Sequence, residues 1–208
     1  MATKLKLSIR RGASPEIPIR VESDVLSYVA ITSMSKSAPL RIGATGHGIL
    51  DGWPVAVMGA GGMTNLNAPW DEIDKGRLDR YLRRSTLVDA DNIDINQVNS
   101  SGFSTYTSGG QLVFYTPLDL SSFVSARMDV KTSIGGAIIA TFNTSDGTLA
   151  IDSADSTIWF KPAIVTPIVI PARDYYFDIE LVRADDSVLA LCAAESVLTV
   201  LPEATTST

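Results

Sequence analysis

Residues 175–182, with the sequence YYFDIELV, carry large apolar side chains at every second position. This period of two is typical of a half-buried β-strand, because successive side chains point to opposite faces of a sheet. Residues 126–131 (ARMDVK), 5–10 (LKLSIR) and 17–21 (IPIRV) repeat the pattern. Several short strands at this spacing predict an all-β fold, either a sandwich or a barrel.

Turn-forming residues separate these stretches. Residues 143–147 (NTSDG) predict a hairpin, because glycine tolerates a positive φ. Asp185 and Asp186 predict a turn before residues 188–200, which are mostly apolar. The prolines between residues 160 and 175 predict an irregular or edge segment, because proline donates no backbone hydrogen bond to a ladder.

One helix is expected, near residues 71–84. This segment opens with acidic and closes with basic side chains, which complements the helix dipole. Pro69 suits a first helical turn, whereas Gly76 weakens the pattern. The apolar side chains approximate a single stripe; they are Ile73, Leu78, Tyr81 and Leu82.

Composition limits the class of protein. The 208 residues, 45% hydrophobic and 19% charged, allow one or two ordinary globular domains, with residues 204–208 as a frayed tail. A net charge of −6 repels a polyanion, so nucleic acid is a poor candidate partner. No stretch approaches the roughly 20 apolar residues of a membrane helix, and the first residues alternate instead of forming a signal peptide. We expect a soluble chain made in the cytoplasm, without a membrane partner.

Side chains that carry chemistry are scarce. Cys192 is the single cysteine and His47 the single histidine, too few for a disulfide or a zinc site. A Ser-His-Asp triad would have to use His47, yet the sequence has no Gly-x-Ser-x-Gly elbow. We expect His47 to fill a turn between two glycines and Cys192 to be a buried apolar thiol. The sequence predicts no enzyme and no catalytic, cofactor-binding or metal-binding residue.

Two motifs imitate ligand sites. Residues 54–64 (PVAVMGAGGMT) look like a strand and a dinucleotide-binding loop, but Thr64 replaces the third glycine and no βαβ unit follows. We interpret this loop as a β-turn. Asp89, Asp91 and Asp94 carry oxygens of the kind that calcium prefers, but the EF-hand pattern fails. A solvated loop and strand edge is favoured over a calcium site.

A family resemblance covers the middle of the chain. It rests on the following stretches: residues 46–49 (GHGI), 51–57 (DGWPVAV), 62–67 (GMTNLN), 89–94 (DADNID) and 102–110 (GFSTYTSGG). In order and spacing, residues 27–110 resemble the E1 FCCH-like β-domain of phage proteins. That family name implies no ubiquitin chemistry, because this stretch contains no cysteine.

A second resemblance covers both ends of the chain. Residues 125–130 (SARMDV), 176–181 (YFDIEL) and 198–202 (LTVLP) carry it. Residues 4–22 together with 119–203 resemble the immunoglobulin-like fold at the front of phage baseplate-upper-protein chains.

The two resemblances imply an immunoglobulin-like β-sandwich interrupted by a small inserted β-barrel-like domain. The sandwich would contain residues 1–26 and 111–203, and the inserted domain residues 27–110. Insertions are tolerated at exposed loop tips where the chain leaves and returns at adjacent points.

The resemblances also imply a function, that of a bacteriophage virion structural protein. We expect an adaptor or appendage subunit of the tail or baseplate, which forms a homo-oligomer and contacts tail, baseplate, fibre or neck subunits. A capsid-decoration or head–neck protein is the first alternative. A host-glycan binding module, with Trp159 and Tyr175 stacking on sugars, is the second.

Interface residues are expected at exposed tryptophans and arginines, which are enriched among interface hot spots. A helix over residues 71–84 would align several arginines on one face, where they would either contact an acidic subunit or remain solvated. The residues expected at the interface are Trp53, Trp70, Arg77, Arg80 and Arg84.

Overall fold

The computed structural model describes residues 5–11, 13, 15–162, 170–192 and 195–202. This part of the chain is all-β, as the alternation predicts, and its helical structure is limited to one four-residue α-helix and two 3-10 turns. None of its helices is long and apolar enough to cross a membrane. The segment between Phe160 and Tyr175 was expected to be irregular or an edge because of Pro162, Pro167 and Pro171. Residues 163–169 of this segment lie outside the described part, as do residues 204–208, which were expected to form a tail.

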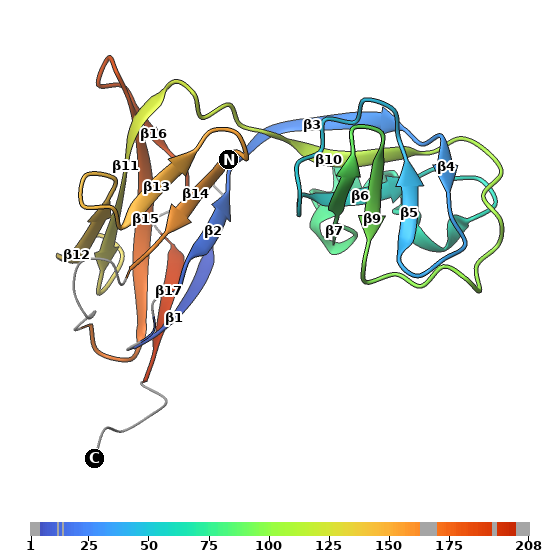
Figure 1. Cartoon of the computed structure of the whole chain (residues 1–208). Coiled ribbons are helices and arrows are strands. Elements are labelled where there is room, and N and C mark those ends of the chain that lie inside the picture. The colour runs from blue at the N-terminus through green and yellow to red at the C-terminus, as the bar shows by residue number, and fades with distance from the viewer. Residues whose placement is uncertain (1–4, 12, 14, 163–169, 193–194, 203–208) are drawn as a thin grey trace. The chain divides into compact units, whose positions relative to one another are not determined.

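The chain divides into two compact units (Figure 1). Met1–Val21 and Leu118–Thr208 form the terminal unit, and Glu22–Pro117 form the central unit. Strands β3 (Glu22–Ala30) and β10 (Gln111–Pro117) pair with each other along the central unit. The boundaries expected at residues 26/27 and 110/111 therefore fall within or beside this strand pair, and the structure places them at 21/22 and 117/118.

The described residues of the terminal unit form two sheets. The six-stranded sheet has the order β1-β17-β15-β11-β12, with β16 paired to β15. Its strands are β1 (Lys6–Arg10), β11 (Phe123–Lys131), β12 (Ile138–Asn143), β15 (Asp174–Arg183), β16 (Val188–Ala190) and β17 (Ser196–Leu201). The three-stranded sheet has the order β13-β14-β2, from β13 (Leu149–Asp152), β14 (Thr157–Phe160) and β2 (Ile17–Arg20).

One hydrophobic core joins these two sheets into a sandwich-like unit. Met128 and Ile179 enter it from the six-stranded sheet, and Ile158 and Phe160 enter it from the three-stranded sheet. The phenyl rings of Phe142 and Phe160 pack edge to face, with centroids 4.9 Å apart. The first and last described strands, β1 and β17, pair in parallel, so the sandwich needs both ends of the chain.

The turn after β12 differs from the predicted hairpin. Strands β12 and β13 belong to different sheets, so residues 143–148 carry the chain from one layer of the sandwich to the other. The Asn143 side chain accepts a hydrogen bond from Asp146 N–H, and the Thr148 hydroxyl accepts one from Asn143 N–H. Hydrogen bonds from side chains within the turn replace the backbone hydrogen bonds that would join two strands of a hairpin. A sequence typical of a hairpin therefore connects the two sheets here.

The central unit also contains two sheets, each of four strands. The first has the order β3-β10-β6-β7, with β6 (Pro54–Met58) and β7 (Arg83–Arg84). The second has the order β4-β5-β9-β8, from β4 (Ser33–Met34), β5 (Leu40–Gly43), β8 (Thr86–Asp89) and β9 (Asn92–Ile95). One core contains buried residues of both sheets, among them Leu40, Ile93, Val57 and Phe114.

Trp53 lies in this core, and its assignment to an exposed interface is wrong. Its side chain is fully buried, and its indole Nε1–H donates to the Tyr115 carbonyl oxygen at 2.8 Å. The Trp53 carbonyl oxygen accepts hydrogen bonds from the backbone and hydroxyl of Ser85. A buried indole with a satisfied N–H stabilises the core and offers no contact to another protein.

Candidate interaction surface

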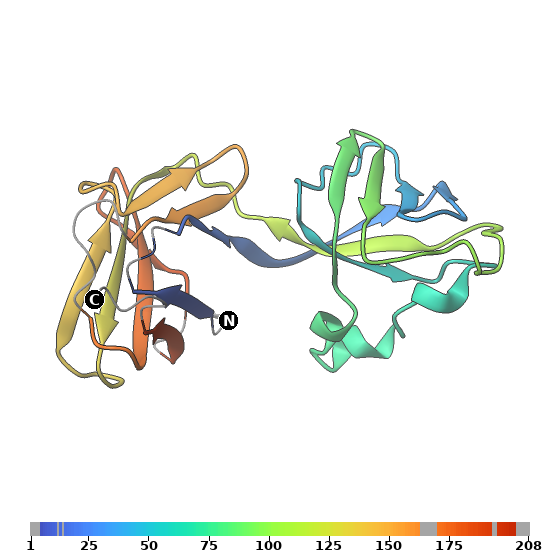
Figure 2. The ribbon, with the colours of Figure 1, turned by 60° about the horizontal axis from the view of Figure 1, so that its bottom comes forward.

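The central strands β6 and β10 of the first sheet of the central unit are buried on both faces. Val55 and Val57 of β6 point into the main core, while Ala56 and Met58 point to the opposite face and are also buried. Residues 69–84, here named the covering segment, pack over that second face. Leu78 of the covering segment is 1% exposed and forms a small hydrophobic cluster with Ala56 and Met58. The partly buried residues of the segment that pack against this cluster are Ile73, Tyr81 and Leu82. Figure 2 shows the short helical turns on one side of the central unit.

The expected helix over residues 71–84 is much shorter in the structure. Helix α1 spans Asp71–Asp74, and the 3-10 turn η2 spans Leu78–Arg80. Gly76, with φ of +63°, ends α1. Its N–H bonds to the Ile73 carbonyl and Arg77 N–H bonds to the Glu72 carbonyl, which is the Schellman arrangement of a helix C-terminus. The glycine is a stop signal, and no single helical face carries the arginines.

An ion pair with a buried carboxylate fixes the reversal after α1. The Glu72 carboxylate is 9% exposed and pairs with the Arg77 guanidinium, which is 38% exposed. Beside it, the exposed Asp71 and Lys75 also pair, and the hydrogen bond from Lys75 lowers the pKa of Asp71. Arg77 therefore holds the covering segment together from within and is not a free cation on the surface.

Trp70 is the second residue of the covering segment and is 52% exposed. Its ring lies against the backbone of Gly59, where an added Cβ would be 3.4 Å from Trp70 Cζ2. Gly59 has a φ of +69°, a conformation that suits glycine. One part of the indole is thus supported by the protein, and the rest faces solvent.

Two of the remaining arginines share this exposed character. Arg80 lies in η2 and Arg84 in β7, and both are exposed. Arg83 is half-buried and donates to the Tyr81 carbonyl oxygen at 3.0 Å. Of the predicted interface residues, Trp70, Arg80 and Arg84 are exposed on or beside one docked segment, whereas Trp53 and Arg77 have structural roles.

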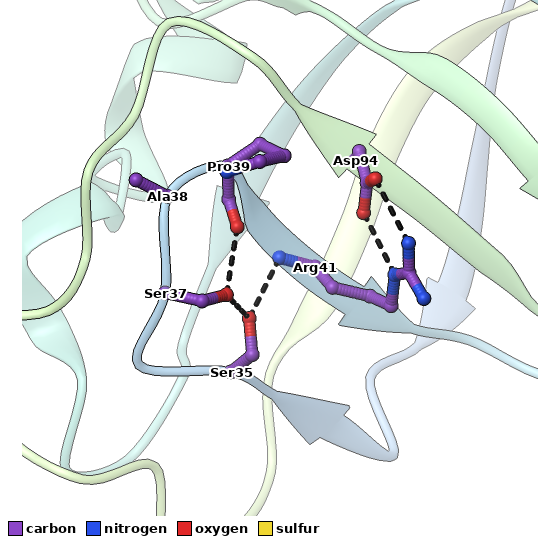
Figure 3. A pocket seen from close by; sticks show the side chains of 6 residues that line it. All are labelled: Ser35, Ser37, Ala38, Pro39, Arg41 and Asp94. Carbon is purple, nitrogen blue, oxygen red and sulfur yellow. Dashed lines mark hydrogen bonds and ion pairs between the residues drawn. The ribbon is translucent and has the colours of Figure 1, made fainter.

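A pocket of about 300 Å³ lies elsewhere on the central unit (Figure 3). Its polar groups satisfy one another. Arg41 donates to both carboxylate oxygens of Asp94, at 2.9 and 3.0 Å, and Arg41 N–H donates to the Ser35 hydroxyl. The Ser37 hydroxyl donates to the Pro39 carbonyl oxygen at 2.7 Å. These hydrogen bonds join the polar groups of the pocket to one another and stabilise the loop and the β5–β9 strand pair that form it.

His47 has a structural role in a turn, as expected. Gly46 and Gly48 on either side have φ of +61° and +62°. Nδ1 of the buried His47 accepts the Ile49 N–H at 2.9 Å, so Nε2 carries the proton and donates to the Asp89 carbonyl oxygen at 3.0 Å.

Cys192 is 3% exposed, which agrees with the predicted buried thiol. Burial raises the pKa of this thiol, and a hydrogen bond with Ser196 opposes the shift in part. A thiol kept protonated by burial is a weak nucleophile.

The three aspartates considered for calcium have separate partners. Asp89 accepts hydrogen bonds from the Asn92 amide and from Asp91 N–H, which lower its pKa. Asp91 accepts the Gly46 N–H at 2.8 Å, and Asp94 pairs with Arg41. Within the described residues, no group of three His, Cys, Asp or Glu side chains is arranged to hold a metal ion. The carboxylates stabilise turns and a strand pair.

The glycine-rich loop after β6 packs against neighbouring backbone. A Cβ on Gly62 would lie 2.1 Å from the Thr105 carbonyl oxygen, so the chain passes too closely for any side chain. The Asn67 amide closes the loop, accepting Ala60 N–H at 3.0 Å and donating to the Ala60 carbonyl oxygen at 2.9 Å. The 3-10 turn η1 (Thr64–Leu66) follows in place of the long helix that a dinucleotide site requires.

Of the two aromatic residues considered for sugar stacking, one is buried and the other half-buried. Tyr175 is fully buried, and its hydroxyl donates to the Pro171 carbonyl oxygen at 2.9 Å, so this ring lies in the core and the alternative of sugar stacking at Tyr175 does not hold. Trp159 is half-buried, with Lys161 Nζ 6.0 Å from its ring centroid.

A charged network on the outer face of the six-stranded sheet was not expected from the sequence. Asp129 on β11 is 5% exposed, lies opposite Asp178 on β15, and accepts the Thr141 hydroxyl at 2.8 Å. Arg127 contacts Asp129 at 3.4 Å and Glu180 at 3.0 Å. The polar residues at alternate positions of β11 and β15 indicate a polar face on each strand. The local sequence does not show that the two strands are neighbours, so it does not predict which charged side chains pair.

No protein-family model matches this chain, and no curated protein matches it.

Proposed function

We propose that this chain is a non-enzymatic structural protein of a bacteriophage virion, an adaptor or appendage subunit of the tail or baseplate. The proposal combines the two family resemblances with one feature of the surface. Trp70, Arg80 and Arg84 are exposed on or beside a segment that a buried leucine and an ion pair hold in place.

This surface supports protein binding for a physical reason. Binding loses affinity when side chains and loops must be ordered, and a segment already docked by Leu78 avoids much of that loss. Tryptophan and arginine are the residues whose loss most often weakens an interface, by about 2 kcal/mol or more at a hot spot. In a symmetric assembly each copy repeats the contact, so a modest surface on each subunit suffices.

Particle incorporation tests the proposal. The double variant Trp70→Ala with Arg80→Glu removes the indole and reverses one charge without touching Leu78 or the Glu72–Arg77 pair. We expect a folded chain whose copy number in purified particles falls at least about tenfold, the effect of losing one hot spot.

A matched control separates this effect from the change in net charge. Val188→Ala with Arg11→Glu makes the same kinds of substitution at exposed positions of the terminal unit, and it should incorporate normally. Equal incorporation of the two double variants would refute the proposed contact. Labelling the incorporated chain in electron micrographs then distinguishes the tail or baseplate from the alternative capsid-decoration or head–neck position.

A host-glycan binding module remains the alternative of another class, with less support than the sequence offered. Tyr175 is buried, which leaves the half-buried Trp159 as the aromatic residue of that hypothesis. Adsorption of whole particles carrying Trp159→Ala tests it, because a receptor-binding role requires adsorption to fall while incorporation is unchanged.

A further inference from the structure

Strand β3 forms an open edge of the first sheet of the central unit. It is nine residues long and begins the strand order β3-β10-β6-β7. Among the described strands, β3 pairs with β10 alone. Val25 is 65% exposed and Tyr28 is 45% exposed. A long edge with exposed apolar side chains is a template on which another strand can pair.

Two hydrogen bonds fix the direction of the backbone groups of β3. Ile31 N–H donates to the Gly110 carbonyl oxygen at 3.0 Å, and the Val25 carbonyl oxygen accepts the Thr116 hydroxyl at 3.0 Å. Both groups face β10. Because the direction alternates along an antiparallel strand, the backbone N–H and C=O of Leu26, Tyr28 and Ala30 point away from β10, toward the open edge.

The side chains along this edge are compatible with a second copy of themselves. Around a two-fold axis at Tyr28, the strand would meet its copy antiparallel, with Tyr28 opposite Tyr28 and Leu26 opposite Ala30. An aromatic pair and an apolar pair are both favourable across strands. Parallel pairing would instead bring Glu22 and Asp24 beside their own copies, where like charges repel.

We propose that β3 pairs antiparallel with the β3 strand of a second copy of this chain, so that the two four-stranded sheets continue into one. The two-fold axis makes the contact isologous. Each hydrogen bond that an outward N–H of one copy donates is therefore matched by an identical bond donated by the other copy. The pairing does not depend on the proposed function, since it concerns the chain by itself in solution.

Two substitutions at one position test the role of the backbone. Tyr28→Pro removes an outward N–H without removing a hydrogen bond to β10, a position where an edge strand tolerates proline. Tyr28→Ala removes the same ring and keeps the N–H. Sedimentation of the full chain should show dimers for the wild type and for Tyr28→Ala. For Tyr28→Pro the dissociation constant of the dimer should be roughly 30-fold higher than for Tyr28→Ala. Each of the two copies lacks one N–H donor, so the symmetric dimer loses two hydrogen bonds.

Cross-linking tests the register and covers the case in which Tyr28→Pro does not fold. Facing residues of a hydrogen-bonded antiparallel pair have Cα atoms about 5.5 Å apart, which a disulfide can span. Under mild oxidation Tyr28→Cys should form a covalent dimer. Leu87→Cys, exposed on the other sheet of the same unit, should not, and the native Cys192 is buried and contributes little background.

Either of two results would overturn the pairing. One is a wild-type chain that stays monomeric at roughly 100 μM, a concentration that populates even weak dimers. The other is equal cross-linking of Tyr28→Cys and Leu87→Cys, which would show random collision and no preferred contact at β3.

Discussion

The six-stranded sheet of the terminal unit and the first sheet of the central unit each pack one face on the main core of their unit. They differ in the opposite face, here called the second face. On the terminal unit that face carries charged side chains that pair across strands, such as Lys131 with Asp178 at 2.6 Å. On the central unit it carries Ala56 and Met58, which the covering segment buries. A strand with alternating polarity can leave one face to water, whereas a strand that is apolar at every position needs a second layer.

The largest effect on stability is expected from a substitution that removes the packing of the covering segment against the sheet. Leu78→Ala removes a leucine that is 1% exposed between the covering segment and the sheet. Loss of its packing should lower the free energy of unfolding by about 3 kcal/mol, measured by urea denaturation. Leu87→Ala removes the same atoms at a 42% exposed position and should cost less than about 0.5 kcal/mol. Similar losses of stability for both variants would mean that the covering segment does not pack against the sheet through Leu78.

A smaller effect is expected from the ion pairs of the two regions. Arg77→Met removes the nearer of the two cations beside the Glu72 carboxylate, which is 9% exposed, and leaves Lys75 at 3.7 Å; it should cost about 2 kcal/mol. The matched variant Arg127→Met acts on a cation that is 54% exposed, against 38% for Arg77, and its buried neighbour Asp129 keeps the hydrogen bond from the Thr141 hydroxyl, so it should cost less than about 1 kcal/mol. Urea denaturation of both variants measures the difference, and a larger loss at Arg127 would reverse the comparison.

The smallest effect is a pH dependence of the charged face. The hydrogen bond to Asp178 raises the pKa of Lys131 above its ordinary value. A raised lysine pKa stabilises the fold below the unfolded value of about 10.4, and this contribution disappears as pH rises through the folded value. Wild type should therefore exceed Lys131→Met in stability near pH 8, and the difference should shrink as the pH rises past the unfolded value of about 10.4. A difference that is constant with pH would contradict the assignment.

Local patterns predicted much of the fold. The alternation at residues 126–131 and 175–182 became β11 and β15, and Asp185–Asp186 became the turn of the β15–β16 hairpin. The run PVAVM at residues 54–58 already signals burial on both faces, although its alanine and methionine were not assigned to a second core. Periodicity reports which side chains are buried, and here it did so reliably.

The failures have a common physical origin in contacts between distant segments. The parallel pairing of β1 with β17 joins the two ends of the described chain, and no local signal specifies it. Residues 143–147 have hairpin composition, but their side-chain bonds direct the chain into another sheet. Trp53 follows a turn and was therefore expected at the surface, yet the Tyr115 carbonyl from a strand far along the sequence receives its N–H.

Hydrogen exchange of the intact chain tests most directly whether the covering segment is a fixed surface. The amides to follow are those of Gly76, Arg77 and Tyr81, each of which donates to a carbonyl within the segment. If the segment is docked by Leu78, these amides should exchange at least about 100-fold more slowly than free peptide, and Leu78→Ala should abolish that protection while β10 stays protected. Exchange of these amides at the rate of free peptide in the wild-type chain would contradict a fixed surface that presents Trp70 and Arg80.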